Sequence, residues 1–482
     1  DSHSKHSGAE GEGPGLVVTA CLGGVRRVEA RVGISFVSTE QAQRALASEV
    51  GNRGFDAVAA GTAAEWELLL GRFRVEGGSD RDRLLWTTMW QRLHAMPGEL
   101  QPDEVPWMAP KYRHFNDIYC LWDSVRCANS LYALVDAPFA SDLCASLVEI
   151  GEQTGWIPDA WMTGGSAYIQ GDCSAAVLFA EAALKRLPGF DADGALRALL
   201  KTLEAPSPDP LSHGRHPGWA KDGFIALGIR NCASRTVEYA FHDHCASLLA
   251  ETIGDGETAT RYRLQAARLW ENWHPGHRCF GPRRPDGSWD DFDPWKPQCR
   301  DFWNDPHFYE GTGHDYALTS WHVMGELVKR HGGAGEFAAY LDEYLKRCYF
   351  WKEINLHAPW LYHYAGMPER VAPALHKLMD RKVKPGRAGL ADNEDMGAWS
   401  SWWITGAMGL CPVPGSDHYL LAAPRFDRIE IDLVGIFRPL TFTVRGDSQK
   451  PLRGISLNGN QLHRFWVSHA EIAAGADIGF HF

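Results

Sequence analysis

Apolar and polar positions in this chain follow two different periods. Between about residues 63 and 410, hydrophobic side chains recur every three or four positions, the spacing of about twelve amphipathic helices. Glycine, proline and aromatic loops separate these segments, which predicts a toroid of paired helices with its loops on the rim. The expected helices are 64–73, 80–95, 115–133, 141–154, 173–187, 193–204, 234–253, 257–273, 311–331, 335–349, 367–381 and 396–409.

Both ends of the chain have the period of β-strands instead. Strands are expected at 16–21 and 28–36, and Ser38 and Gln41 then form a capping box that opens a helix. The later strands are expected at 429–433, 440–444, 455–457 and 478–482, with a turn at Asn458-Gly459. The strands of the two ends are candidates for one shared sheet. We therefore expect a mainly α fold with β, divided into 1–60 (partial β-sandwich and linker helix), 61–411 (helical domain) and 412–482 (C-terminal strands).

Composition narrows the possible partners. The formal net charge is −12 without a basic run, which argues against nucleic acid or an anionic membrane as the partner. No apolar stretch reaches the 18 residues that a membrane span requires, and the eleven cysteines contain no CxxC pair. Twenty tryptophans are an excess, and tryptophan rings often stack on ligand faces, so carbohydrate is a good candidate ligand.

The first candidate catalytic group is Glu310, which follows an aromatic run and precedes a helix. Burial against the rings would raise its pKa, whereas the dipole of the helix would lower it, and a general acid needs the first effect to be larger. The alternative is a carboxylate that only caps backbone amides.

The second candidate is the run Asp392-Asn393-Glu394-Asp395 before the predicted helix at 396–409. Four polar groups exceed what capping requires, so Asp395 is the candidate base, with Asn393 and Glu394 beside it. The helix that follows carries Trp402, a candidate sugar-binding ring. The alternative is a solvated acidic turn.

Two further groups are candidates for ligand binding. Asp123 and Arg126 are neighbours on one helix beside Trp122, so they form either an ordinary ion pair or a pair that grips sugar hydroxyls. Glu353, Asn355 and His357 stand before a proline and offer oxygen and nitrogen atoms. Glu353 is assigned to substrate, and Asn355 and His357 to a hard cation such as calcium; a polar loop is the alternative.

Eight blocks occur in the order in which they appear in glycoside hydrolase family 92, the calcium-dependent exo-acting α-mannosidases. They are Arg31–Ala42, Leu121–Arg126, Gly155–Pro158, Ser234–Ala240, Tyr309–Gly311, Pro359–Gly366, Asn393–Asp395 and Leu457–Gly459. The chain resembles this family from about residue 28 to near its end.

The resemblance implies an (α/α)6 barrel joined to a β-sandwich, and inverting removal of terminal α-linked mannose from glycans. It implies that Glu310 is the acid and that Asp395 is the base or its partner, with carboxyl groups about 6.5–9.5 Å apart. It also implies calcium at the sugar hydroxyls and an extracellular or periplasmic location.

Three departures bear on that expectation. Members carry a long sandwich before the block at Arg31, so a second chain that completes the sandwich, or a shortened sequence, is expected here. The residues after Glu310 differ from the usual family run, which predicts changed substrate contacts. Val323 stands where many members place a polar calcium ligand, and a valine side chain cannot coordinate a cation, which argues against calcium.

The alternatives to an α-mannosidase are therefore a catalytically weakened carbohydrate-binding or partner-dependent subunit, a mannose-1-phosphate diester hydrolase, and a glycosidase of another (α/α)6 family.

Overall fold

The computed structural model describes residue 24 and residues 28–105, 107, 111–162, 165–166, 173–205, 215–299, 304–348, 352–448 and 451–482. The chain divides into two compact units, Asp1–Ala63 and Ala64–Phe482. The predicted division into 1–60, 61–411 and 412–482 stays a prediction. The (α/α)6 arrangement stays a prediction.

The first unit contains helix α1 (Thr39–Glu49) and most of helix α2 (Phe55–Leu70). The predicted start of α1 is confirmed, because the Ser38 side chain accepts a hydrogen bond from the Gln41 backbone N–H. The strand predicted at 28–36 is wrong: this segment is irregular, and its apolar side chains, such as Val32 at 75% exposure, face solvent. The strand predicted at 16–21 lies outside the described residues.

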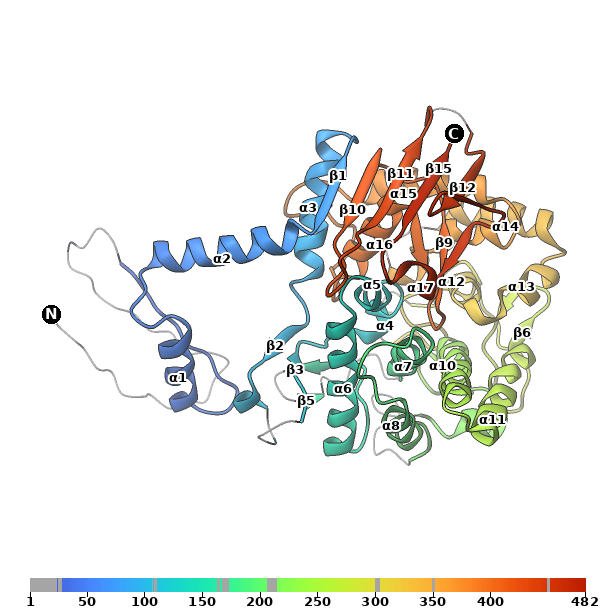
Figure 1. Ribbon diagram of the computed structural model, residues 1–482. Helices are drawn as coiled ribbons and strands as arrows, with labels where there is room; N and C mark the ends of the chain where they lie inside the picture. Colours follow the sequence, from blue (N-terminus) through green and yellow to red (C-terminus); the bar gives the residue numbers. More distant parts are fainter. Residues whose placement is uncertain are drawn as a thin grey trace. The chain divides into compact units, whose positions relative to one another are not determined.

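The second unit is dominated by helices. They are α3 (Asp80–Leu93), α4 (Leu121–Ser124), α5 (Ala128–Val135), α6 (Ala137–Thr154), α7 (Ala175–Leu184), α8 (Ala192–Glu204), α9 (Gly218–Asp222), α10 (Cys232–Thr252), α11 (Gly256–Ala267), α12 (Gly313–Leu318), α13 (Met324–Arg330), α14 (Ala334–Arg347), α15 (Val371–Lys382), α16 (Ala398–Met408) and α17 (His469–Ile472). Most of the predicted helices are confirmed. Helices α5, α6, α7, α8, α10 and α11 lie beside one another in the middle and lower part of the molecule (Figure 1).

The predicted helix 311–331 is interrupted. The 3₁₀ turn η3 (Trp321–Val323) separates α12 from α13. Three further 3₁₀ segments, η4 (Glu353–Asn355), η5 (Ala358–His363) and η6 (Pro368–Arg370), carry the chain from α14 to α15. The polar residues predicted at 353–357 therefore lie on tightly wound backbone between two helices.

Two sheets contain most of the strands. The larger has the order β1-β10-β11-β15-β12-β13, and β11 and β15 are its only parallel pair among the described strands. Its strands are β1 (Phe73–Glu76), β10 (Arg428–Ile431), β11 (Leu440–Arg445), β12 (Gly454–Leu457), β13 (Asn460–Leu462) and β15 (Asp477–His481). The C-terminal strand predictions and the Asn458-Gly459 turn are confirmed. Strand β1, rather than the segment at 28–36, joins the C-terminal strands from the N-terminal side (Figure 1).

The smaller sheet has three strands, in the order β14-β9-β8. They are β8 (Leu410–Pro412), β9 (His418–Leu421) and β14 (Trp466–Ser468). Short pairs join β2 (Gly98–Leu100) to β3 (His114–Asn116), β4 (Trp161–Met162) to β5 (Gly165–Ser166) and β6 (Trp273–His274) to β7 (Cys279–Phe280). Among the helices of the described residues, none is long and apolar enough to cross a bilayer.

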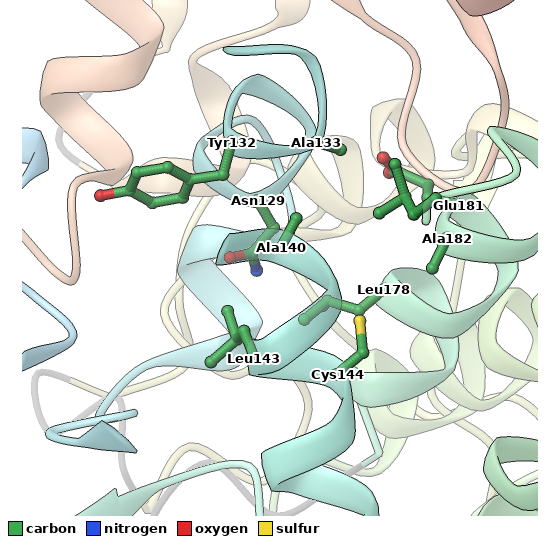
Figure 2. Close-up of a pocket in the computed structure, with 10 residues that line it drawn as sticks. Asn129, Tyr132, Ala133, Ala140, Leu143, Cys144, Leu178, Glu181 and Ala182 are labelled. Carbon is green, nitrogen blue, oxygen red and sulfur yellow. The ribbon is translucent and has the colours of Figure 1, made fainter. Parts of the chain in front are cut away.

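A small cavity lies among α5, α6 and α7. Figure 2 shows Asn129, Leu143, Cys144 and Leu178 around it. Its volume of about 20 Å³ is of the order needed for a single water molecule and far below the space that a sugar ring needs. The substrate site must therefore be sought elsewhere.

Candidate active site

Carboxyl groups from separate segments of the fold converge on one place. Asp123 comes from α4, Glu353 from η4, and Asp395 from the loop before α16. One oxygen of each lies within 4.8 Å of the other two. The sequence assigned these three residues to two different roles, and the structure brings them together.

Lys352 connects this acidic triad, which consists of Asp123, Glu353 and Asp395, to a fourth and a fifth carboxylate. Its Nζ atom lies 3.2 Å from Oε2 of Glu310 and 2.7 Å from Oδ2 of Asp392. The lysine side chain is only 7% exposed, so its charge acts at short range and with little screening. Lys352 thus pairs with two carboxylates, and its charge also acts on Glu353 and Asp395 of the triad.

Burial and crowding raise the pKa values of the triad. Burial, followed by the charges of Glu353 and Asp395, raises the pKa of Asp123 well above its usual value. Burial and the Asp395 carboxylate raise the pKa of Glu353 to about 8. Burial also raises the pKa of Asp395, although the Lys352 ammonium opposes it. The triad therefore favours protons or a cation.

The pKa of Glu310 answers the question that its sequence position left open. Its carboxyl group is only 8% exposed, and this burial raises its pKa above the usual value despite the opposing charge of Lys352. The direction of the pKa shift of Glu310 thus follows burial and not the dipole of the following helix. A raised pKa is what a general acid requires.

The backbone is strained at the same residues. Glu310, Asp395 and Met396 have φ values of 46°, 45° and 56°, in the left-handed region that side chains with a Cβ seldom adopt. Each such residue costs about 1–3 kcal/mol, and such strain persists where the surrounding structure holds it for a function. Both predicted catalytic carboxyl groups are therefore held in uncommon backbone conformations.

Neighbouring side chains fix the orientation of the triad. The indole N–H of Trp399 donates to Oε1 of Glu353 at 2.6 Å. The thiol of Cys120 lies 3.7 Å from Oδ1 of Asp395 and donates to it. These contacts orient Glu353 and Asp395 within the triad.

Trp122 and Arg126 form a wall beside the triad. The Arg126 guanidinium lies 4.4 Å from the centre of the Trp122 ring, and both side chains donate to Oε1 of Glu238, at 3.4 Å and 3.1 Å respectively. The edge of Trp122 meets Tyr309, whose ring centre is 5.1 Å away. Arg126 therefore pairs with Glu238 and not with Asp123 as the sequence suggested, although its charge still lowers the pKa of Asp123.

Two other predicted site residues belong to the loop before α16 without facing the triad. Asn393 is exposed. One oxygen of Glu394 accepts from the Ser400 backbone N–H at 2.8 Å and the other lies 3.8 Å from Arg92. Burial raises the pKa of Glu394 to about 7. Glu394 thus holds the first turn of α16.

The remaining predicted residues support the walls of the site. Trp402 is buried, and its indole N–H donates to the Leu356 carbonyl at 2.8 Å. The Asn355 amide donates to Asp315 at 2.7 Å, and Nε2 of His357 lies 3.2 Å from the Leu318 carbonyl oxygen. Burial lowers the pKa of His357 to about 3, so its ring is neutral. Asn355 and His357 thus have protein partners other than the acidic triad.

The chain was compared with known proteins. Residues 41–482 match the profile of the glycosyl hydrolase family 92 catalytic domain. This chain belongs to glycosyl hydrolase family 92. An uncharacterized secreted glycosidase of Arthroderma benhamiae is 27% identical, over 96% of this chain and 61% of that protein. The predicted resemblance to this family is thereby confirmed.

Solved structures of family 92 members share the fold. A family α-mannosidase from Bacteroides thetaiotaomicron superimposes with a TM-score of 0.82 at 21% identity, over 93% of this chain and 61% of its own. An inverting mannosidase from the same bacterium gives 0.83 at 23% identity, over 93% of this chain and 65% of its own. This chain spans less than two thirds of the length of these relatives.

The acidic triad has the chemistry of a site for a hard cation. Calcium takes oxygen ligands, and the triad offers a carboxylate oxygen from each of three residues. A divalent cation would relieve the mutual repulsion that raises the pKa values of these groups. The ligand set that fits this family 92 chain is thus the triad, whereas Asn355 and His357 were the predicted ligands.

Lys352 is the functional candidate that sequence reasoning missed. It stands directly before Glu353, which the sequence did single out, and follows the aromatic pair Phe350-Trp351. A lysine in such a setting is seldom buried unless it is paired. That signal was available, but its two partners are distant in sequence and became evident only from the fold.

Proposed function

We propose that this family 92 chain hydrolyses terminal α-linked mannose with inversion, using Glu310 as general acid and Asp395 as general base. The observation that carries the proposal is that the Asp395 carboxylate lies close enough to Glu310 to help raise its pKa. The two residues stand on separate strained loops, in a buried site with an excess of carboxyl groups. The mannosidases among the structural neighbours support the choice of sugar.

The proposed chemistry gives Glu310 and Asp395 opposite roles in proton transfer. Glu310, protonated because burial raises its pKa, donates its proton to the glycosidic oxygen as the bond to C1 breaks. Asp395, ionised, accepts a proton from the water that attacks C1 from the opposite face. Lys352 opposes the burial effect at Asp395 and so favours its ionised form. The charge of Lys352 acts on Glu310 in the same sense, so the opposite protonation states that an acid and a base need are part of the proposal.

Calcium is part of the proposal. Asp123, Glu353 and Asp395 would hold the ion, which when bound would polarise the sugar hydroxyls that coordinate it. Asp123 and Glu353 otherwise bear raised pKa values and would compete for protons. Val323 does not count against this assignment, because the triad lies on other segments of the chain.

One observation favours a second candidate substrate, a mannose-1-phosphate diester. Lys352 places an ammonium beside Glu310, and Arg92 and Arg387 line a cavity of about 500 Å³ together with Asp392 and Glu394. These cations would stabilise an anionic leaving group, and phosphate needs less protonation than an alcohol. The measure that separates the two substrates is kcat/KM for an aryl α-mannoside against that for a mannose-1-phosphate diester.

Two other expectations stay predictions. The secreted glycosidase of Arthroderma benhamiae supports an extracellular location. A catalytically weakened subunit that binds glycans, or one that needs a second chain to complete its β-sandwich, would share the acidic triad and fail to turn over.

The test is proton NMR of the anomeric signal during hydrolysis of an activated α-mannoside. The expected first product is β-mannose, and Glu310→Gln and Asp395→Asn each slow its appearance, whereas the exposed Glu257→Gln serves as the matched control. A chelator is expected to abolish turnover and calcium to restore it. Release of α-mannose would refute inversion, and absence of turnover with added calcium would favour the weakened subunit.

A further inference from the structure

We propose a second carbohydrate-binding site in the cavity between η5–η6 and the three-stranded sheet, remote from the acidic triad. The cavity has a volume of about 630 Å³. Its walls include His363, Tyr364, His418, Arg464, Phe465 and Trp466. This volume lies within the range of small-molecule sites, roughly 300–1,000 Å³, and is sufficient for a short oligosaccharide.

This aromatic cavity lies at the opposite end of α16 from the catalytic loop. Asp395 precedes the helix, whereas Val413, which lines the cavity, follows it. Eleven residues of α-helix span about 16 Å at 1.5 Å per residue. A sugar in the aromatic cavity would therefore not occupy the catalytic site.

The aromatic walls are rigidly held. The Arg464 guanidinium lies 4.1 Å from the centre of the Trp466 ring, and its Nε donates to the Trp466 carbonyl at 2.9 Å. Another nitrogen of Arg464 pairs with Glu471 at the start of α17. His418 meets the edge of Trp466 with ring centres 4.7 Å apart. Trp466 thus stands in a fixed orientation before any ligand arrives.

Imidazole nitrogens lie among these rings. The ring of His363 bonds to the Leu421 backbone, and its Nε2 atom is buried without a hydrogen-bond partner among the described residues. The His418 side chain is 44% exposed and is therefore the more accessible of the two. Nδ1 of His418 is held 2.8 Å from Asp417. Burial lowers the pKa of His363 to about 4, so near neutral pH its ring can donate or accept but carries no charge.

This combination fits a neutral sugar. A pyranose ring has an apolar face that packs on tryptophan, tyrosine or phenylalanine, and an edge of hydroxyl groups that imidazole nitrogens can bind. An anionic ligand fits less well, because Glu471 already neutralises Arg464. A glycosidase that acts on branched glycans would gain residence time by holding a second arm at this site. That the sugar is mannose rests on the proposed function; the site itself rests on its own residues.

The first test is hydrogen exchange of the Glu310→Gln chain with α-linked mannotriose and, separately, with maltotriose. We expect slower exchange at residues 363–368 and 413–418 with at least one of the two sugars. Protection confined to the catalytic loops, or absent with both sugars, would overturn the proposal. Protection by maltotriose alone would keep the second site and count against mannose as its ligand.

The second test uses variants of Trp466, which lines the aromatic cavity and has no proposed role in catalysis. Trp466→Ala is expected to weaken mannotriose binding at the second site at least tenfold by calorimetry, whereas Trp466→Phe retains most of it. Both variants should hydrolyse an aryl α-mannoside at the unchanged rate, which also reports correct folding. Unchanged sugar binding by a folded Trp466→Ala chain would overturn the proposal. Hydrolysis of the aryl α-mannoside tests the proposed function, and mannotriose binding tests the second site. Failure of one can therefore be told apart from failure of the other.

Discussion

Two buried lysine–glutamate pairs in this chain do different things. Lys185, which follows the last residue of α7, pairs with Glu181 of that helix, and Glu181 also accepts from the Ser130 hydroxyl at 2.6 Å and the Gly415 backbone N–H at 3.0 Å. Lys352 is shared by Glu310 and Asp392 beside the acidic triad. In the first pair one ammonium faces one carboxylate, both of whose oxygens accept hydrogen bonds, whereas the second pair lies in an excess of negative charge. Burial of an ion pair is thus compatible with either a structural or a catalytic role, and the surrounding charge decides which.

The sharpest contrast is expected in catalysis. Glu310→Gln removes the proton donor of the second pair and should slow hydrolysis of an unactivated α-mannoside by about 10²–10⁴-fold, with the melting temperature nearly unchanged. The same Glu→Gln change at Glu181 should leave kcat per folded molecule unaltered. The measurement is steady-state kinetics beside thermal unfolding. Equal activity losses in both variants would remove the distinction.

Substitutions in the Lys185–Glu181 pair should change the stability of the fold and not its catalytic activity. Lys185→Met leaves Glu181 buried without its cation and should lower the free energy of unfolding by about 3–5 kcal/mol, measured by denaturant titration. The exposed Lys377→Met is the matched control. Adding Glu181→Leu to Lys185→Met should recover part of the loss, because no charge then remains buried. An unstable control or a stable Lys185→Met chain would contradict this role.

The acidic triad should make stability depend on pH in the opposite sense from an ordinary carboxylate. Because folding raises the pKa of Glu353 to about 8, the folded chain binds more protons than the unfolded chain between about pH 4.5 and 8. Without calcium, stability should therefore fall as pH rises through this window, by a few kcal/mol at most. Glu353→Gln or added calcium should flatten the dependence of the melting temperature. A profile unchanged by both would contradict the crowding of charge at this site.

The fold could be predicted better than the contacts within it. Helical periodicity located α6, α8 and α10 because each has a long amphipathic or apolar pattern, and the alternation at 440–444 located β11. The segment at 28–36 alternates equally well, but a strand also needs neighbours to bond to, and periodicity does not show whether they exist.

The candidate site was predictable in its residue types and not in its pairings. Glu310 and Asp395 stood out because polar groups gathered at helix starts beside aromatic residues. Arg126 was matched to Asp123 because they are three positions apart, yet its partner is Glu238 on α10. Partners distant in sequence, such as Lys352 and Asp392, are set by the three-dimensional packing of loops, which no local pattern records.

The smallest expected effect is that of Lys352, whose charge should influence the pKa of Glu310. Burial raises the pKa of Glu310 and the charge of Lys352 lowers it, so Lys352→Met should raise this pKa further. The basic limb of kcat/KM against pH, which reports loss of the proton from the acid, should then move to higher pH. Lys352→Arg keeps the charge and should leave the limb in place, even if kcat falls through altered geometry. A limb that moves downward in Lys352→Met, or equally in both variants, would show that Lys352 acts through packing and not through its charge on Glu310.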